Sequence, residues 1–212
     1  MKLNIRILAA LLMLALASVA CLTSSKESGD VLFSDDFSST SSGWDQTEDA
    51  VYTADYNDGA YQIVVHETSS DAWANPGSRT FTDVRVEVDA TKNSGPDDND
   101  FGVICRYVDT THFYFALISS DGYYGILKMS DGEYSVLGRE DMVPSDVINL
   151  GDATNRIRLD CVGSTLTLYI NDTQVDQQTD DEFASGNVGL IAGTYEVAGT
   201  DILFDNFYVY QP

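Results

Sequence analysis

Residues 100–128 read DFGVICRYVDTTHFYFALISSDGYYGILK, and they are the most informative part of the chain for its fold. Two polar segments, Asp109-Thr110-Thr111 and Ser120-Asp121-Gly122, interrupt three apolar and aromatic runs. Runs of β-branched and aromatic residues separated by Asp, Thr, Ser and Gly are typical of hairpins. The stretch therefore predicts three consecutive antiparallel strands.

The same pattern continues in both directions. Apolar and charged residues alternate strictly over residues 84–90, which indicates a strand with one solvated face. Further strands are predicted at residues 60–65, 156–162, 165–170, 173–175, 188–192 and 202–210. We find no convincing amphipathic helix. Many short strands with tight turns predict an all-β fold, a two-sheet antiparallel β-sandwich of the jelly-roll type. The first and last strands are expected to pair, because pairing covers two open sheet edges.

The N-terminus has the composition of an export signal. In residues 1–20, Lys2 and Arg6 precede an apolar run that ends in small residues. Cys21 directly follows the expected signal-peptide cleavage site, which is the position of the lipidated cysteine in a bacterial lipoprotein. Plain secretion is the alternative, because Ser18 stands where such signals usually have Leu. We expect residues 21–30 to form a flexible tether and residues 31–212 a single domain. The protein is then exported and anchored to the outer face of the cytoplasmic membrane or to the cell surface, or else secreted.

The chain is strongly acidic, with a formal net charge of −23. Such a surface repels nucleic acid and anionic lipid headgroups, so contact with a membrane is expected only through the lipid anchor. The acidic residues serve either solubility or calcium binding.

Two cysteines remain once Cys21 is assigned to the signal. Cys105 and Cys161 both lie within predicted strands. An even pair in an exported chain suggests a disulfide, which would close a loop of about 56 residues and stabilise the fold by about 3 to 4 kcal/mol. Two buried free thiols are the alternative.

Several segments together resemble one superfamily. These are DDF at 35–37, Trp44, DGAYQIVV at 58–65, the opening stretch, LTLYINDTQV at 166–175, GNVGLIA at 186–192 and FDNFYVY at 204–210. They resemble the concanavalin A-like lectin and glucanase jelly rolls, and among these the laminin-G-like and 3-keto-disaccharide-hydrolase-like domains of exported bacterial lipoproteins. The resemblance covers residues 31–210. It implies the sandwich but no particular activity, because this architecture carries lectins, glycosidases and adhesion domains.

No catalytic residue is assigned. Related glucanases carry three acids on one strand, with either of two spacings. Here Glu87 and Asp89 match the first two acids, but the place of the third acid holds Thr91 in one spacing and Lys92 in the other. The general acid that retaining hydrolysis needs is therefore missing from this motif. The two histidines, His66 and His112, fit no triad or zinc motif.

Calcium is the expected inorganic cofactor, in a structural role. The resemblance implies a site between the chain ends, formed by Asp35 or Asp36 with Asp205. A second cluster of oxygen ligands occupies residues 97–100. For both clusters, the alternative is that no metal binds and that Asp and Asn are present because they favour turns.

Aromatic residues suggest a sugar platform. By alternation, Phe113 and Phe115 share the core face of their strand, and Tyr114 takes the opposite face. The expected ligand-binding residues are Trp73, Arg106, Tyr114, Tyr123 and Tyr124. Packing and β-propensity alone would also explain the tyrosines.

The leading hypothesis for the function is non-catalytic glycan or polysaccharide binding. The alternatives are a glycoside-acting hydrolase of the 3-keto-disaccharide type and a structural or adhesive lipoprotein.

The lipid anchor is directly testable. We expect mass spectrometry of the mature N-terminus to find Cys21 as the first residue, carrying a diacylglycerol adduct. A Cys21→Ser variant should lose the adduct and be released from membranes. An unmodified Cys21 in the wild-type protein would instead indicate plain secretion.

Overall fold

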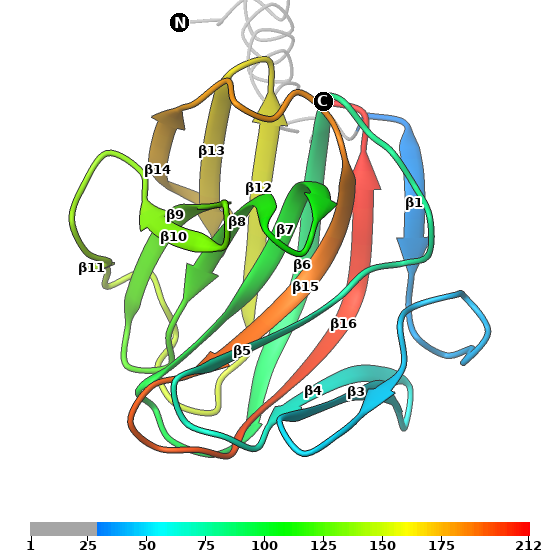
Figure 1. Cartoon of the computed structure of the whole chain (residues 1–212), viewed down its shortest axis with the longest axis vertical. Coiled ribbons are helices and arrows are strands. Elements are labelled where there is room, and N and C mark those ends of the chain that lie inside the picture. The colour runs from blue at the N-terminus through cyan, green and yellow to red at the C-terminus, as the bar shows by residue number, and fades with distance from the viewer. Residues whose placement is uncertain (1–28) are drawn as a thin grey trace, which may run out of the picture.

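Two antiparallel sheets make up the computed structural model, which describes residues 29–212 (Figure 1). The expected signal peptide and Cys21 lie outside the described residues. Within residues 29–212 there is no α-helix, as the sequence predicted. No helix in this part of the chain is long and apolar enough to span a membrane.

The larger sheet has nine strands. Its order is β14 (Thr173–Thr179), β13 (Thr165–Ile170), β12 (Asn155–Val162), β6 (Val84–Ser94), β16 (Thr200–Tyr210), β4 (Ala60–Val65), β3 (Tyr52–Asn57) and β2 (Thr47–Glu48), with β1 (Val31–Asp35) also paired to β16. The last strand, β16, therefore lies near the centre of this sheet, between β6 on one side and both β4 and β1 on the other.

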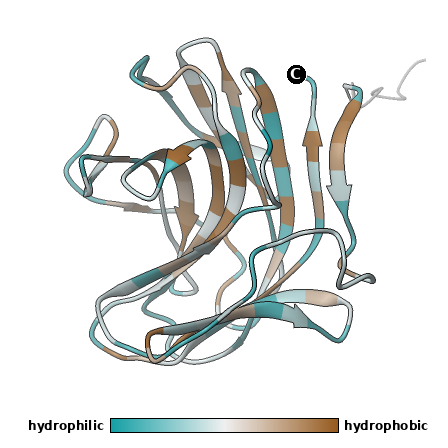
Figure 2. Ribbon diagram, turned by 45° about the vertical axis from the view of Figure 1, so that its right-hand side comes forward, coloured by the Kyte–Doolittle hydropathy of each residue, from teal (hydrophilic) through white to brown (hydrophobic). Residues whose placement is uncertain are grey.

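The smaller sheet has seven strands. Its order is β10 (Glu133–Val136), β9 (Tyr123–Ser130), β8 (His112–Ile118), β7 (Asn99–Asp109), β15 (Asn187–Thr194) and β5 (Ser70–Ala74), with β11 (Val143–Pro144) also paired to β9. Figure 2 shows that its strands curve strongly. The three strands predicted from residues 100–128 are β7, β8 and β9, joined in antiparallel register as expected.

The chain ends pair as predicted. Val31 is the register partner of Tyr210, and Asp35 is the partner of Phe207. Because β1 and β16 are neighbours, the start and the end of the domain lie side by side (Figure 1).

The main hydrophobic core fills the space between the sheets. The disulfide Cys105–Cys161 crosses this core and joins β7 of the smaller sheet to β12 of the larger, which confirms the predicted pair. Both cysteines are fully buried.

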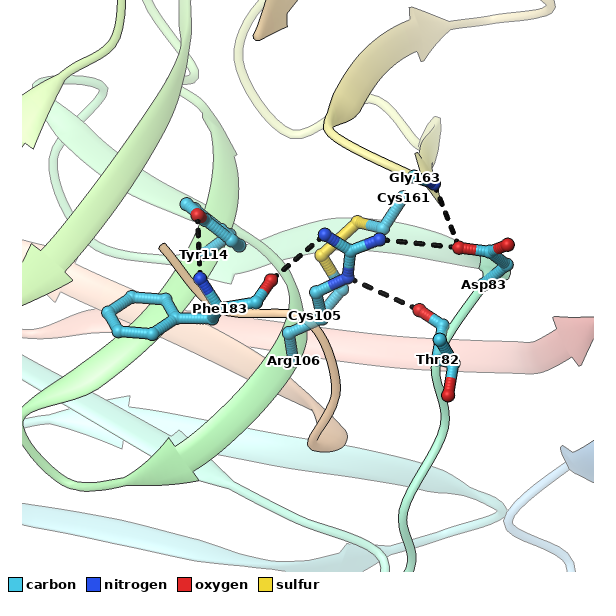
Figure 3. Close-up of a disulfide and its surroundings, with 8 residues drawn as sticks. All are labelled: Thr82, Asp83, Cys105, Arg106, Tyr114, Cys161, Gly163 and Phe183. Atoms are coloured by element: carbon cyan, nitrogen blue, oxygen red, sulfur yellow. Dashed lines mark hydrogen bonds and ion pairs between the residues drawn. A yellow bond between two sulfur atoms is a disulfide. The ribbon is translucent and has the colours of Figure 1, made fainter. Parts of the chain in front are cut away.

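Arg106 follows Cys105 and interrupts the regular strand. Its φ of 51° is unusual for a non-glycine residue, and the register of β7 against β8 shifts here, as at a β-bulge. The side chain, 1% exposed, donates to the carbonyls of Thr82 and Phe183 at 3.2 and 2.9 Å. It also pairs with Asp83 at 3.4 Å, and Asp83 accepts from the backbone N–H of Gly163 (Figure 3).

Removing the disulfide should destabilise the domain. We expect the double variant Cys105→Ala/Cys161→Ala to lose about 3 to 4 kcal/mol of unfolding free energy, because the unfolded chain regains the freedom of a long loop. Guanidinium denaturation measures the loss. Both proteins carry Cys21→Ser, so that neither is lipidated, and a double variant with the midpoint of the disulfide-bonded protein would contradict the prediction.

Candidate functional site

The smaller sheet is apolar on both faces. Along β8, Tyr114, Ala116 and Ile118 enter the core between the sheets, so Phe113, Phe115 and Leu117 lie on the other side. We call this second side the curled face, and its buried residues are Ile104, Phe113, Phe115, Leu117, Leu127, Met129 and Ile191. It is a candidate ligand surface because it faces away from the larger sheet.

Aromatic rings form a continuous group on the curled face. The Phe113 ring lies 5.3 Å from that of Phe115, 5.4 Å from that of Tyr107 and 5.6 Å from that of Trp73. Trp73 and Tyr107 are half-buried at the margin of this group. The bulge at Arg106 places Tyr107 here, because β7 gains one extra residue against β15 at this point and the alternation along β7 reverses.

Two adjoining cavities open over the curled face. The smaller has a volume of about 190 Å³ and the larger about 530 Å³. Leu127, Tyr134 and Tyr195 line both. The two tyrosines are 63% and 37% exposed, respectively, so their rings are available to a ligand.

The remaining polar lining of the cavities is acidic or hydroxylic. The larger cavity is lined by Asp98, Ser119, Asp121, Tyr123, Glu140 and Asp141, and the smaller by Ser69, Asp71, Asp100 and Thr194. Among the described residues, no Lys, Arg or His lines either cavity. The site therefore favours neutral or cationic ligands over anionic ones.

A carboxylate pair lies in the smaller cavity. Asp71 on β5 and Asp100 on β7 are both register partners of Gly193 on β15, the strand between them. A Cβ at Gly193 would lie 2.5 Å from Oδ1 of Asp100 and closer still to Oδ1 of Asp71. The two oxygens are therefore at most about 5 Å apart. No other residue type could replace Gly193 without displacing both carboxylates.

The environment makes both acids weak. Burial and the charge of Asp71 raise the pKa of Asp100 to about 7, although the nearby Tyr195 hydroxyl opposes the shift. Asp71 keeps part of its surface exposed, yet the surrounding protein still raises its pKa through burial. Asp100 is 4% exposed, and its Oδ1 has no hydrogen-bond partner.

Three of the predicted ligand residues lie outside both cavities, two of them fully buried and Tyr124 half-buried, which corrects the expectation. Tyr114 is fully buried in the core, where its hydroxyl bonds to Asp180 and accepts from the Phe183 N–H at 3.1 Å. Arg106 is held by the contacts described above. Tyr124 packs against the main core and donates to the Val175 carbonyl at 3.0 Å. The face assignment was reversed: the Tyr114 face is the core, and the Phe113 face is the curled face.

Of the other two predicted residues, one lines a cavity and the other lies on the curled face outside both cavities. Tyr123, 42% exposed, lines the larger cavity, and Trp73 belongs to the aromatic group. Trp73 lies in strand β5, which is not among the strands predicted from the sequence. Tyr134 and Tyr195 were not assigned from the sequence, nor was the Asp71–Asp100 pair. Gly193 within an apolar strand was the available signal, because glycine in a strand often marks a close approach of other groups.

The expected calcium ligands at the chain ends each have local partners. Asp35 accepts from the Phe37 N–H at 2.8 Å and from Trp44 Nε1 at 2.9 Å. Asp36 accepts from Ser38, and Asp205 from the Asn206 N–H. In residues 29–212 no group of three or more His, Cys, Asp or Glu could hold a metal ion. Calcium at this place stays an untested prediction.

The residues of the incomplete glucanase motif lie on the outer face of the larger sheet. Glu87 is buried in an ion pair with Arg156, and Asp89 bonds to the same guanidinium at 3.1 Å. These acids are structural charges, as the missing third acid indicated.

Comparisons with known proteins agree on the fold. No protein-family model and no curated protein sequence matches the chain. The carbohydrate binding module CBM66 from Bacillus subtilis superimposes with a TM-score of 0.65 at 19% identity, covering 80% of this chain and 96% of that one. A Bacillus subtilis protein of unknown function with a galectin-like fold gives 0.63 at 13% identity, covering 87% and 97%. The Bacillus licheniformis beta-glucanase gives 0.60 at 10% identity, covering 85% and 98%. At these identities the similarity shows the jelly-roll sandwich alone.

The raised pKa of Asp100 has a measurable effect on stability. Its folded value lies above the unfolded value of about 3.9, so stability should fall as pH rises from about 4 to about 7. We expect Asp100→Asn to be more stable than wild type at pH 8, by up to a few kcal/mol, with a smaller gain at pH 5. Chemical denaturation at both pH values tests this. Asp58→Asn, in an exposed turn, is the control, and an equal gain for Asp100→Asn at both pH values would contradict the assignment.

Proposed function

We propose that this protein binds glycans without catalysis, in the two cavities over the curled face. The observation that carries the proposal is the set of tyrosines around the larger cavity: Tyr123, Tyr134 and Tyr195 are exposed beside carboxylate and hydroxyl oxygens. Sugar rings present C–H faces that pack on aromatic rings, and their hydroxyls donate to carboxylates. The volume of about 530 Å³ is in the range of small-molecule sites.

The fold neighbours support this proposal. One of them is a carbohydrate binding module and another is a glucanase. The proposed location is the outer surface of the cell envelope, with Cys21 as the lipid anchor. A purely structural or adhesive role is less well supported, because the curled face is neither smooth nor uniformly polar.

Glycoside hydrolysis is the second candidate, because of the Asp71–Asp100 pair. Retaining glycosidases hold two carboxyl groups about 5 to 5.5 Å apart. However, an acid and a nucleophile work best when their environments push their pKa values apart. Here burial raises the pKa of both groups, and both lie side by side over Gly193. Binding is therefore the better-supported function.

Glycan binding should depend on the cavity tyrosines. We expect the protein to bind a subset of a glycan array. For each hit, Tyr134→Ala and Tyr123→Ala should weaken binding about three- to tenfold, the effect of losing one aromatic contact. Isothermal titration calorimetry measures the affinities, and repeating the array with EDTA tests whether calcium contributes.

The matched control is Tyr208→Ala. Tyr208 lies on the outer face of the larger sheet, where its ring stacks on Tyr210 at 5.6 Å. Affinity that falls with Tyr208→Ala and not with the cavity variants would move the site to the other sheet. Release of reducing sugar from a bound glycan, lost in Asp100→Asn, would favour the hydrolase.

A further inference from the structure

Asp100 is exceptional among the buried acids. The other buried carboxylates of residues 29–212 all have donors: Asp35 has Trp44, Glu87 has Arg156, Asp176 has Arg139, and Asp201 has Asn93 and Gln62. Asp100 has no basic partner, and its Oδ1 accepts no hydrogen bond. A buried polar atom without a partner destabilises the fold, so its presence points to a ligand that supplies the missing donor.

The surroundings of Asp100 concentrate negative charge at one point. Asp71 approaches from the other side of Gly193, and Asp98 adds to the local negative potential. Phe115, Leu117 and Leu127 form the apolar wall of the cavity, where charges interact more strongly than in water. The hydroxyl groups of this cavity belong to its lining residues Ser69, Tyr134, Thr194 and Tyr195.

A small organic cation suits this cavity better than a metal ion. Calcium takes six to eight oxygen ligands, whereas the described residues offer no cluster of three acids here. An ammonium group has three N–H donors, which two carboxylates at most about 5 Å apart can share. The rings of Phe115, Tyr134 and Tyr195 line the same cavity and can interact favourably with a cation.

We infer that the smaller cavity, with Asp71 and Asp100 at its centre, binds the ammonium group of an amino sugar with a free amine. This inference rests on the proposed glycan binding and adds its ligand class: cationic glycans that lack N-acetylation at the bound residue. The cavity of about 190 Å³ holds the charged substituent, and the adjoining larger cavity holds the rest of the oligosaccharide. Anionic glycans are disfavoured, since no basic described residue lines either cavity.

Binding of a cation must also change the protonation of the pair. The groups that face Asp100 are Asp71 from β5, Asp98 from the turn before β7, Tyr195 after β15, and Tyr134 of β10 beyond Tyr195. Burial and the charge of Asp100 raise the pKa of Tyr195, so it stays a neutral donor at neutral pH. An ammonium ion stabilises ionised Asp100 and lowers its pKa, so binding near pH 7 releases protons. A neutral sugar causes no such release.

Three tetrasaccharides of the same linkage test the inference: β-1,4-linked glucosamine, its fully N-acetylated counterpart and cellotetraose. Titration calorimetry at pH 6.5 on the whole protein should give at least tenfold tighter binding of the glucosamine tetramer than of either neutral one. Titrations in buffers of different ionisation enthalpy should show proton release with the glucosamine tetramer only.

Two variants test whether the preference for the amine and the proton release arise at Asp71 and Asp100. Asp100→Asn and Asp71→Asn should each reduce the ratio of the affinity for the glucosamine tetramer to the affinity for the neutral tetramers to about twofold, and each should abolish proton release, whatever change they cause in the affinity for the neutral tetramers. Tyr134→Ala, in contrast, should weaken all three ligands. Because Asp100→Asn is expected to stabilise the fold at neutral pH and above, loss of preference in it would not reflect misfolding.

The outcomes separate this inference from the proposed function. Equal binding of the three tetramers would overturn the ammonium site and leave glycan binding standing. Binding of no glycan, here or on the array, would overturn both. Tight calcium binding that Asp100→Asn abolishes would identify the pair as a metal site instead, and cleavage of the glucosamine tetramer would identify it as catalytic.

Discussion

Cys105 and Arg106 are neighbours in β7, and together they hold four segments in place. The cysteine bonds the smaller sheet to the larger one through Cys161. The arginine ties the carbonyls of Thr82 and Phe183 and the carboxylate of Asp83 to the same point (Figure 3). A buried guanidinium needs several acceptors, and a disulfide restricts the unfolded chain, so each contact limits where the others can lie. The end of the sandwich is therefore rigid next to the curled face.

The bulge at Arg106 links this end of the sandwich to the aromatic group of the curled face. Without the extra residue, Arg106 would occupy the curled face and Tyr107 would enter the core. The positive φ of Arg106 reverses the alternation, and Tyr107 joins Phe113 and Trp73 instead. A basic side chain is thereby kept away from the aromatic group of the curled face.

The acidic residues on the two sheets differ in whether they have a basic partner. On the outer face of the larger sheet, Glu87 and Asp89 are matched by Arg156, and such pairs are electrostatically satisfied. On the curled face, Asp71 and Asp100 approach each other without a basic partner. Functional sites often retain groups that destabilise the fold, because the ligand supplies the missing interaction. The contrast between the two faces is the physical reason for placing the site over β5, β7 and β15.

Most of the strands, the pairing of the chain ends and the disulfide could be predicted from the sequence, because they depend on local alternation, turn residues and cysteine count. The strands β3, β5 and β10 were not predicted. The faces could not, because the smaller sheet is apolar on both sides and period-2 alternation does not say which side meets the larger sheet. Tyr114 and Arg106 were misplaced for that reason and because a bulge is invisible in composition. The proximity of Asp71 and Asp100 depends on β15 lying between β5 and β7 and on Gly193 lacking a side chain. Strand order and register are properties of the tertiary structure, and they alone brought the two carboxylates together.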